Sequence, residues 1–124
     1  MNPIIINAAE DTPKIRLDAA NEVFEISGRS LPEDVVKFYT PILEWLNEYA
    51  KSPNEHTVFD FKFTYFNTAS SKIILDIMLK LGEIHDAGKN ITIKWHYPSD
   101  DEDMEDAGIE YAEIVDIPIK MVEY

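Results

Sequence analysis

The chain changes from strand-like to helix-like spacing of its apolar residues at Tyr65-Phe66-Asn67-Thr68-Ala69-Ser70-Ser71-Lys72. The preceding segment, Val58–Phe63, alternates in the manner of a β-strand, whereas the apolar residues between Ile73 and Ile84 recur at helical spacing. Asn67 or Thr68 is therefore the expected N-cap of a helix. The spacing predicts a strand followed directly by a helix, which is the basic unit of an α/β sheet.

Three hydroxyl groups lie at this junction, on Thr68, Ser70 and Ser71. A helix N-terminus presents unpaired backbone N–H groups and the positive end of the helix dipole. A phosphate group attached to one of these hydroxyls would be well held there. The alternative is an ordinary helix cap followed by small residues.

The N-terminal third of the chain predicts a β-hairpin followed by a helix. Ile15–Leu17 and Val23–Ile26 have the alternating character of two paired strands. Ser30–Glu33 has capping-box spacing and an early proline, so a helix is expected to begin there. Pro41 falls inside that helix and should kink it, or restart it with Thr40 as a cap.

The remaining elements alternate between strand and helix. Strands are expected over about Thr57–Tyr65, Ile91–Tyr97 and Ile117–Val122, the last at a sheet edge because of Pro118. Helices are expected from residue 68 to about Ala87 and, shorter, after the acidic run Asp100–Asp106. The order predicts an α/β fold with a mixed central β-sheet, an N-terminal hairpin and about three helices. Thr68 would lie just past the carboxyl end of a central strand, where α/β proteins usually place their working groups.

Composition limits the kinds of partner and chemistry. The 124 residues suit one domain, 1–124, and the net charge of −13 opposes binding to nucleic acid or an anionic membrane. The chain has no cysteine, which excludes disulfides and thiol chemistry. The first residues do not form a signal peptide, and no apolar run approaches the length of a membrane span. A cytoplasmic protein is expected.

Metal sites and catalytic motifs are not recognisable. His56, His85 and His96 lack the spacing of metal ligands, and no cofactor motif is present. The acidic run Asp100–Asp106 does not match a calcium loop, since Gly108 lies outside it. It is expected to be a solvated face or a docking surface for a basic partner. A small metal-dependent enzyme that uses this acidic run remains the alternative function.

Several motifs together resemble the SiaC family of bacterial regulatory phosphoproteins, from about Pro13 to Pro118. The resemblance rests on Leu31-Pro32-Glu33-Asp34, the aromatic helix with Trp45, Tyr65 to Lys72, Gly88-Lys89-Asn90-Ile91 and Trp95-His96-Tyr97. It implies a single STAS-like (SpoIIAA-like) domain, similar to anti-sigma factor antagonists.

The resemblance implies that Thr68 is the phosphoacceptor. Asn67, Ser70, Ser71 and Lys72 are expected to shape the site without taking part in chemistry, and Ala69 stands where the family is expected to have serine. The implied partners are a protein kinase with a histidine-kinase-like ATPase domain, a PP2C-like phosphatase and a diguanylate cyclase, which links the protein to cyclic-di-GMP signalling. The function expected is that of a non-enzymatic partner-switching regulator. A constitutive adaptor, in which Thr68 is only a cap, is a third possibility.

Overall fold

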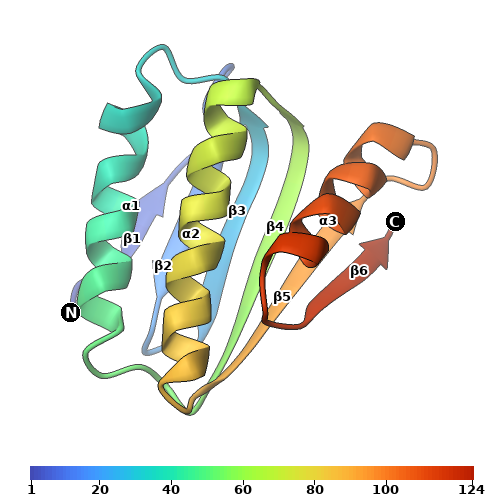
Figure 1. The fold of residues 1–124 in the computed structure, drawn as a ribbon. Coiled ribbons are helices and arrows are strands. Elements are labelled where there is room, and N and C mark those ends of the chain that lie inside the picture. Colours follow the sequence, from blue (N-terminus) through green and yellow to red (C-terminus); the bar gives the residue numbers. More distant parts are fainter.

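The computed structural model describes residues 1–124, which form one six-stranded mixed sheet and three helices (Figure 1). The strands lie in the sheet in the order of the sequence. β1, β2 and β3 pair antiparallel, and β3, β4, β5 and β6 pair parallel. The elements are β1 (Ile4–Ile6), β2 (Lys14–Asp18), β3 (Val23–Ser30), α1 (Val35–Tyr49), β4 (His56–Phe66), α2 (Thr68–Asp86), β5 (Asn90–Tyr97), α3 (Glu102–Ile114) and β6 (Ile119–Glu123).

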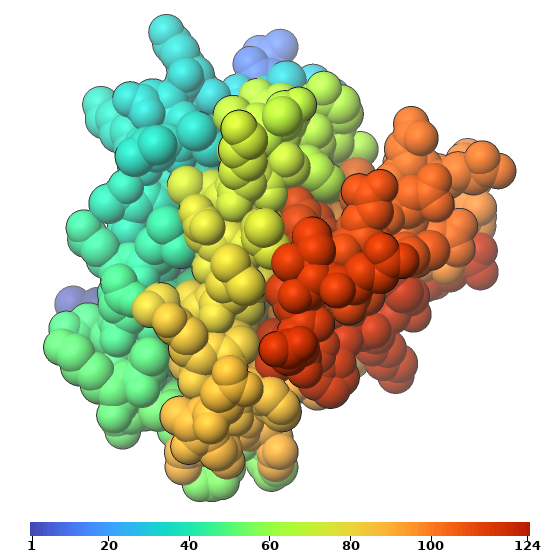
Figure 2. Space-filling view, viewed as in Figure 1, coloured from blue at the N-terminus to red at the C-terminus, as the bar shows by residue number.

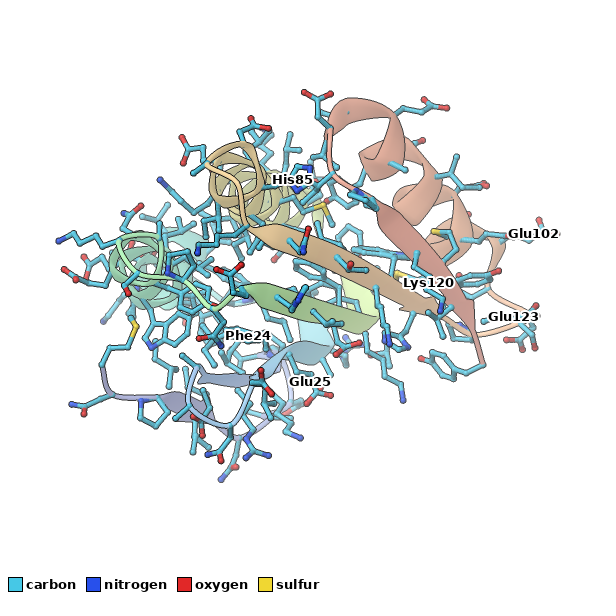
Figure 3. The ribbon with its side chains drawn as sticks, turned by 90° about the horizontal axis from the view of Figure 1, so that it is seen from below. Phe24, Glu25, His85, Glu102, Lys120 and Glu123 are labelled. Atoms are coloured by element: carbon cyan, nitrogen blue, oxygen red, sulfur yellow. The ribbon has the colours of Figure 1, made fainter.

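All three helices cover the same face of the sheet (Figures 1 and 3). Each helix connects two neighbouring parallel strands, and the strand order always advances in one direction. Crossover connections of one hand therefore place every helix on the same side. The opposite face of the sheet has no helix over it.

The hydrophobic core lies between this sheet face and the helices. Successive inward residues of the central strand β4 are Phe59, Phe61 and Phe63, and all three are fully buried. The Phe59 and Phe61 ring centroids lie 4.7 Å apart, and Trp95 of β5 lies 5.9 Å from Phe61. Burying each such ring contributes on the order of 2 kcal/mol. The helices close the core with Tyr39, Ile42, Leu46, Ile74, Ile77, Met78 and Leu81.

Most of the predicted elements are confirmed, as is the mixed sheet with its N-terminal hairpin. In the hairpin, Leu17 pairs with Phe24. Helix α2 begins at Thr68 and ends at Asp86, and Gly88 beyond it has a φ of 106°, a conformation that favours glycine. β6 is an edge strand, and Pro118 immediately precedes it.

The predicted start of the first helix at Ser30–Glu33 is wrong. Ser30 is the last residue of β3 and pairs with Phe66 of β4. Helix α1 begins at Val35 instead, with Asp34 Oδ1 accepting a hydrogen bond of 3.1 Å from Lys37 N. The capping-box spacing predicted the wrong start because the partners of Ser30 lie far away in the sequence. A local sequence pattern does not include such partners.

The predicted restart of this helix at Pro41, with Thr40 as its cap, is also wrong. Helix α1 is continuous from Val35 to Tyr49 with Pro41 inside it. Thr40 does not cap a second helix, because its hydroxyl donates a hydrogen bond of 2.6 Å to the Val36 carbonyl one turn earlier. The buried face of the helix, including Tyr39 and Ile42 on either side, outweighs the lost backbone hydrogen bond.

One strand, β1, was not predicted from the sequence. Its three residues pair with β2 at the edge of the sheet, where Ile4 opposes Leu17. The Trp45 indole N–H donates a hydrogen bond of 2.8 Å to the Asn2 carbonyl, which holds this short strand beside α1.

Two glycines inside helices give a matched test of the packing. A Cβ on Gly108 of α3 would lie 2.4 Å from Cδ1 of Trp95, whereas a Cβ on Gly82 of α2 would have no atom within 4 Å. We expect Gly108→Ala to destabilise the protein by about 1–3 kcal/mol, because the buried indole cannot move aside. We expect Gly82→Ala to stabilise it by up to about 1 kcal/mol. Urea denaturation measures both, and equal effects of the two substitutions would contradict the packing described for α3.

Candidate phosphoacceptor site

The candidate site is the N-terminus of α2, directly after the carboxyl end of β4. Asn67 is the N-cap, and its side-chain oxygen accepts a hydrogen bond of 2.8 Å from Ser70 N. Asn67 N donates to the Ser30 carbonyl of the neighbouring strand β3 at 3.2 Å. A helix N-terminus leaves its first N–H groups without partners inside the helix. At this terminus, the N–H groups of Thr68 and Ala69 still have no hydrogen-bond partner. They are available to an anion.

The three candidate hydroxyls differ sharply in their surroundings. Ser70 is fully buried, and its hydroxyl donates a hydrogen bond of 2.9 Å to the Ser30 carbonyl. The Ser71 hydroxyl donates one of 2.7 Å to the Thr68 carbonyl. Thr68 is exposed, and its hydroxyl makes no hydrogen bond within the protein. Thr68 therefore offers the accessible hydroxyl of the three.

A buried chain of hydroxyls fixes this end of α2 to the rest of the fold. Ser30 Oγ lies 2.9 Å from Ser70 Oγ and 2.6 Å from the Tyr39 hydroxyl of α1. All three residues are fully buried. Desolvation raises the pKa of Tyr39 to about 12, against the smaller opposing effect of its hydrogen bond with Ser30. The chain joins β3, α1 and α2 directly beneath Thr68.

The sequence did not identify Ser30 or Tyr39 as parts of the site. Ser30 lies 40 positions before Ser70 and Tyr39 lies 9 positions after Ser30. The sequence offered one signal, which is that Ser30 stands near the end of a strand. Parallel pairing with the next strand would bring it beside the start of α2.

The electrostatics of the α2 N-terminus favour an added negative charge. Its first turn has no acidic residue, whereas the first turn of α3 has Glu102, Asp103 and Glu105. The exposed Lys72 follows Thr68 by four positions, and residues at this spacing are neighbours on a helix surface. A phosphate on Thr68 would meet the helix dipole, two free N–H groups and one ammonium group.

A shallow groove runs between α2 and α3 beside this site. Its volume is about 240 Å³. Figure 2 shows α2 passing between α1 and α3 across the helical face of the molecule. The Tyr111 hydroxyl at the base of the groove donates a hydrogen bond of 2.8 Å to the Ser71 carbonyl, and desolvation raises the pKa of Tyr111. The lining residues are Phe66, Ser71, Lys72, Leu75, Ala107, Glu110, Tyr111 and Ile114.

The acidic run has a structural role at the start of α3. Asp101 is the N-cap and accepts a hydrogen bond of 2.9 Å from Met104 N, and the acidic residues after it lie at the positive end of the helix dipole. No three His, Asp or Glu side chains are grouped so that they could hold a metal ion. His96 Nε2 lies 2.7 Å from Asp60 Oδ1, and His56 pairs with Asn90. None of the three helices combines the length and the apolar character that a membrane span requires.

The fold and this site define an α/β protein that presents an exposed threonine hydroxyl at the N-terminus of the helix after a central strand. The chain belongs to the SiaC family of regulatory phosphoproteins, whose family model matches residues 6–124. The family predicted from the sequence motifs is thereby confirmed.

Individual relatives agree with this assignment over almost the whole chain. An uncharacterised protein of Pseudomonas aeruginosa strain UCBPP-PA14 is 25% identical over 118 residues, which cover 95% of this chain and 94% of the relative. The solved structure of SiaC from Pseudomonas aeruginosa superposes with a TM-score of 0.90 at 23% identity and covers 100% of both chains. SiaC of the same organism, in complex with the diguanylate cyclase SiaD that it activates, gives a TM-score of 0.87 at 24% identity, covering 98% of this chain and 99% of that one.

Ionisation of Tyr39 should weaken the fold at alkaline pH. Its pKa rises from 10 to about 12 on folding, so the stabilisation is present below pH 10 and is lost between pH 10 and 12. Two pKa units correspond to about 3 kcal/mol. We expect Tyr39→Phe to cost about 1 kcal/mol at pH 7 and to lose much less stability than the wild type over this pH range. Urea denaturation at a series of pH values measures the difference; parallel pH profiles would show that Tyr39 ionises freely in the folded protein.

Proposed function

We propose that this chain is a non-enzymatic partner-switching regulator that is reversibly phosphorylated on Thr68 and controls a diguanylate cyclase. Residues 1–124 act as one STAS-like domain. The unphosphorylated form binds and activates the cyclase, and phosphorylation ends the interaction. A protein kinase with a histidine-kinase-like ATPase domain adds the phosphate, and a PP2C-like phosphatase removes it.

The observation that carries the proposal is the contrast among the three hydroxyls at the start of α2. A kinase must reach a hydroxyl oxygen and align it with the transferred phosphoryl group. Ser70 is buried and the Ser71 hydroxyl is bonded to the Thr68 carbonyl, so both would have to leave their partners first. The Thr68 hydroxyl requires no such rearrangement. Membership of a regulatory phosphoprotein family gives the phosphate a role as a signal.

The neighbouring residues shape the site without doing chemistry. Asn67 holds the first turn through Ser70 N, and Ser70 anchors that turn to the buried hydroxyl chain. The Ser71 hydroxyl is turned toward the Thr68 carbonyl, away from the anion position. Lys72, four positions after Thr68, supplies a positive charge on the same helix face for the phosphate. Ala69 contributes only its backbone N–H, so the loss of a hydroxyl at this position leaves the acceptor intact.

The diguanylate cyclase is proposed as the partner because the similar SiaC of Pseudomonas aeruginosa forms a complex with such an enzyme as its activator. The groove between α2 and α3 supports a contact beside Thr68, because apolar Leu75 and Ile114 line it and Ile114 is 56% exposed. A partner side chain buried there would bring the partner surface over the start of α2.

Phosphorylation would end binding through a local effect. It adds about 1.5 to 2 negative charges to a protein whose net charge is already −13. Salt at physiological strength screens charges beyond about 8 Å. A phosphate covered by a partner surface that offers no counter-charge of its own, in contrast, costs several kcal/mol. Desolvation and close repulsion at the covered surface therefore dominate over repulsion between the whole molecules.

Phosphorylation should be found on Thr68 in protein purified from its native host. Peptide mass spectrometry across Phe63–Lys72 locates the phosphate, and phosphatase treatment should remove it. Thr68→Ala should abolish the modification while costing less than about 0.5 kcal/mol of stability, since Asn67 is the cap. Ser71→Ala is the matched control and should leave the phosphate in place. A phosphate on Ser71 alone would contradict the residue assignment, and the absence of phosphate from all three hydroxyls in the native host would favour the constitutive adaptor, in which Thr68 is never modified.

Moderate salt should restore little of the cyclase binding that phosphorylation removes. Binding of the native diguanylate cyclase is measured by calorimetry for the phosphorylated and unphosphorylated protein at low and moderate salt, with Thr68→Ala as the form that stays unmodified. Full recovery of binding in moderate salt would mean that diffuse repulsion, and not local desolvation, ends the interaction. Equal binding of both forms at every salt concentration would contradict the switch itself.

A further inference from the structure

The sheet face opposite the helices, here called the open face, is basic although the protein is strongly acidic. Its side chains stand in cross-strand rows fixed by the pairing register. One row holds Arg16, Glu25, Asp60, Lys94 and Lys120, and the next holds Lys14, Ser27 and Lys62. These two rows contain five of the 11 Lys and Arg residues but only two of the 24 Asp and Glu residues.

The two carboxylates of these two rows already have partners within the fold. Glu25 lies 3.3 Å from the Lys14 ammonium group, and Asp60 accepts the 2.7 Å contact of His96 Nε2. Figure 3 shows Glu25 projecting from the side of the sheet away from the helices, opposite to its neighbour Phe24. Both carboxylates at the centre of the face are therefore in contact with neighbouring side chains of the same protein.

Four cations of these rows form no ion pair, although Arg16 lies near Asp18, whose pKa is lowered mainly by hydrogen bonds from Asn21 and also by the charge of Arg16. No carboxylate lies within 4.0 Å of Arg16, Lys62, Lys94 or Lys120. Lys94 and Lys120 are directly paired across β5 and β6, so two lysine side chains leave the sheet from neighbouring positions. Like charges placed directly opposite each other destabilise a sheet. Such a pair would be stabilised by an anionic group bound from outside.

Apolar side chains border these cations. Ile5 of β1 is 64% exposed beside Arg16, and Val58 of β4 is 41% exposed. At the other end, the ammonium group of Lys62 lies 4.5 Å from the ring centroid of Tyr124. The open face thus combines cations that form no ion pair with exposed apolar and aromatic groups, so that one partner segment could contact both kinds of group.

We propose that the open face is a second docking surface, separate from the Thr68 site, and that it binds an acidic segment of a partner protein. Carboxylates of the segment pair with Lys94, Lys120 and Lys62, while its apolar side chains contact Val58 and Tyr124. The charge complementarity is local, because the rest of the molecule is acidic. It therefore selects a partner by the position of its carboxylates as well as by their number.

An acidic protein segment fits this face better than a nucleic acid or a second copy of the chain. A nucleic acid carries a continuous line of phosphates, which would meet the acidic remainder of the protein on every side of the face. Two copies, each with a net charge of −13, repel each other on approach. A short segment with a few carboxylates avoids both costs and gains from the apolar border.

The test uses the full chain and a labelled short peptide of alternating Glu and Val. Fluorescence anisotropy at physiological salt measures its affinity, and amide chemical shifts of the isotope-labelled protein locate it. We expect shifts along β4, β5 and β6, and a loss of affinity of about ten-fold or more in Lys94→Glu/Lys120→Glu. Lys37→Glu/Lys51→Glu, on and just after α1, changes the net charge equally and is the matched control, expected to change the affinity less than about two-fold. If charge reversal disturbs folding, the milder double variant Lys94→Gln/Lys120→Gln is measured in its place.

Four results would overturn the proposal. The first is no binding of the peptide, and the second is an equal loss in both double variants. The third is shifts confined to α2 and α3, which would assign the peptide to the Thr68 side. The fourth is evidence for another occupant of the same strands. Binding of a single-stranded oligonucleotide as tightly as the peptide would indicate a nucleic acid, and concentration-dependent shifts without peptide would indicate a second copy. None of these outcomes bears on whether Thr68 is phosphorylated.

Discussion

The one-sided covering of the sheet is the constraint on which the rest of the structure depends. Four large aromatic side chains of β4 and β5, Phe59, Phe61, Phe63 and Trp95, point to one face and are fully buried there. Three successive crossovers between parallel neighbours then place α1, α2 and α3 over that face and leave the other uncovered. The molecule therefore has a helical side, where Thr68 lies at the start of α2, and a bare sheet side, where only the outward residues of the strands are available.

The buried hydroxyl groups beneath α2 fix the position of the candidate site. A buried hydroxyl without a partner costs about 1–3 kcal/mol, and here Ser30, Tyr39 and Ser70 satisfy one another at 2.6 and 2.9 Å. This arrangement holds only when the end of β3, the second turn of α1 and the first turn of α2 meet in one geometry. The hydroxyl chain consequently determines where the Thr68 side chain is presented, and it explains why Ser30 cannot serve as a helix cap.

Local patterns predicted those parts of the fold whose causes are local. The alternation around Phe61 and the helical spacing after Ile73 lie within the elements that they specify, and they predicted β4 and α2 correctly. They limited the cap of α2 to Asn67 or Thr68, of which the structure has Asn67. The start of α1 failed because Ser30 is held by Ser70, and β1 was missed because the Trp45 indole holds it from a distance of 43 positions. Gly108 is required by a ring on another element, which no spacing along α3 could reveal. The choice of Thr68 came from family resemblance, and the physical reason for preferring it over Ser70 needed the burial of Ser70.

The two sides of the molecule are electrically separate, and this follows from their distance as well as from their composition. The Thr68 site and the Lys94–Lys120 pair lie on opposite sides of the packed core, and physiological salt screens exposed charges beyond about 8 Å. A phosphate at the start of α2 therefore acts strongly on groups within the same surface and only weakly on Lys94 or Lys120 behind the sheet. A single small domain of this architecture can change the charge of one surface while the other keeps its own. Any coupling between them would have to pass through the packed core or the backbone of β4, which ends at Phe66 immediately before the Asn67 cap.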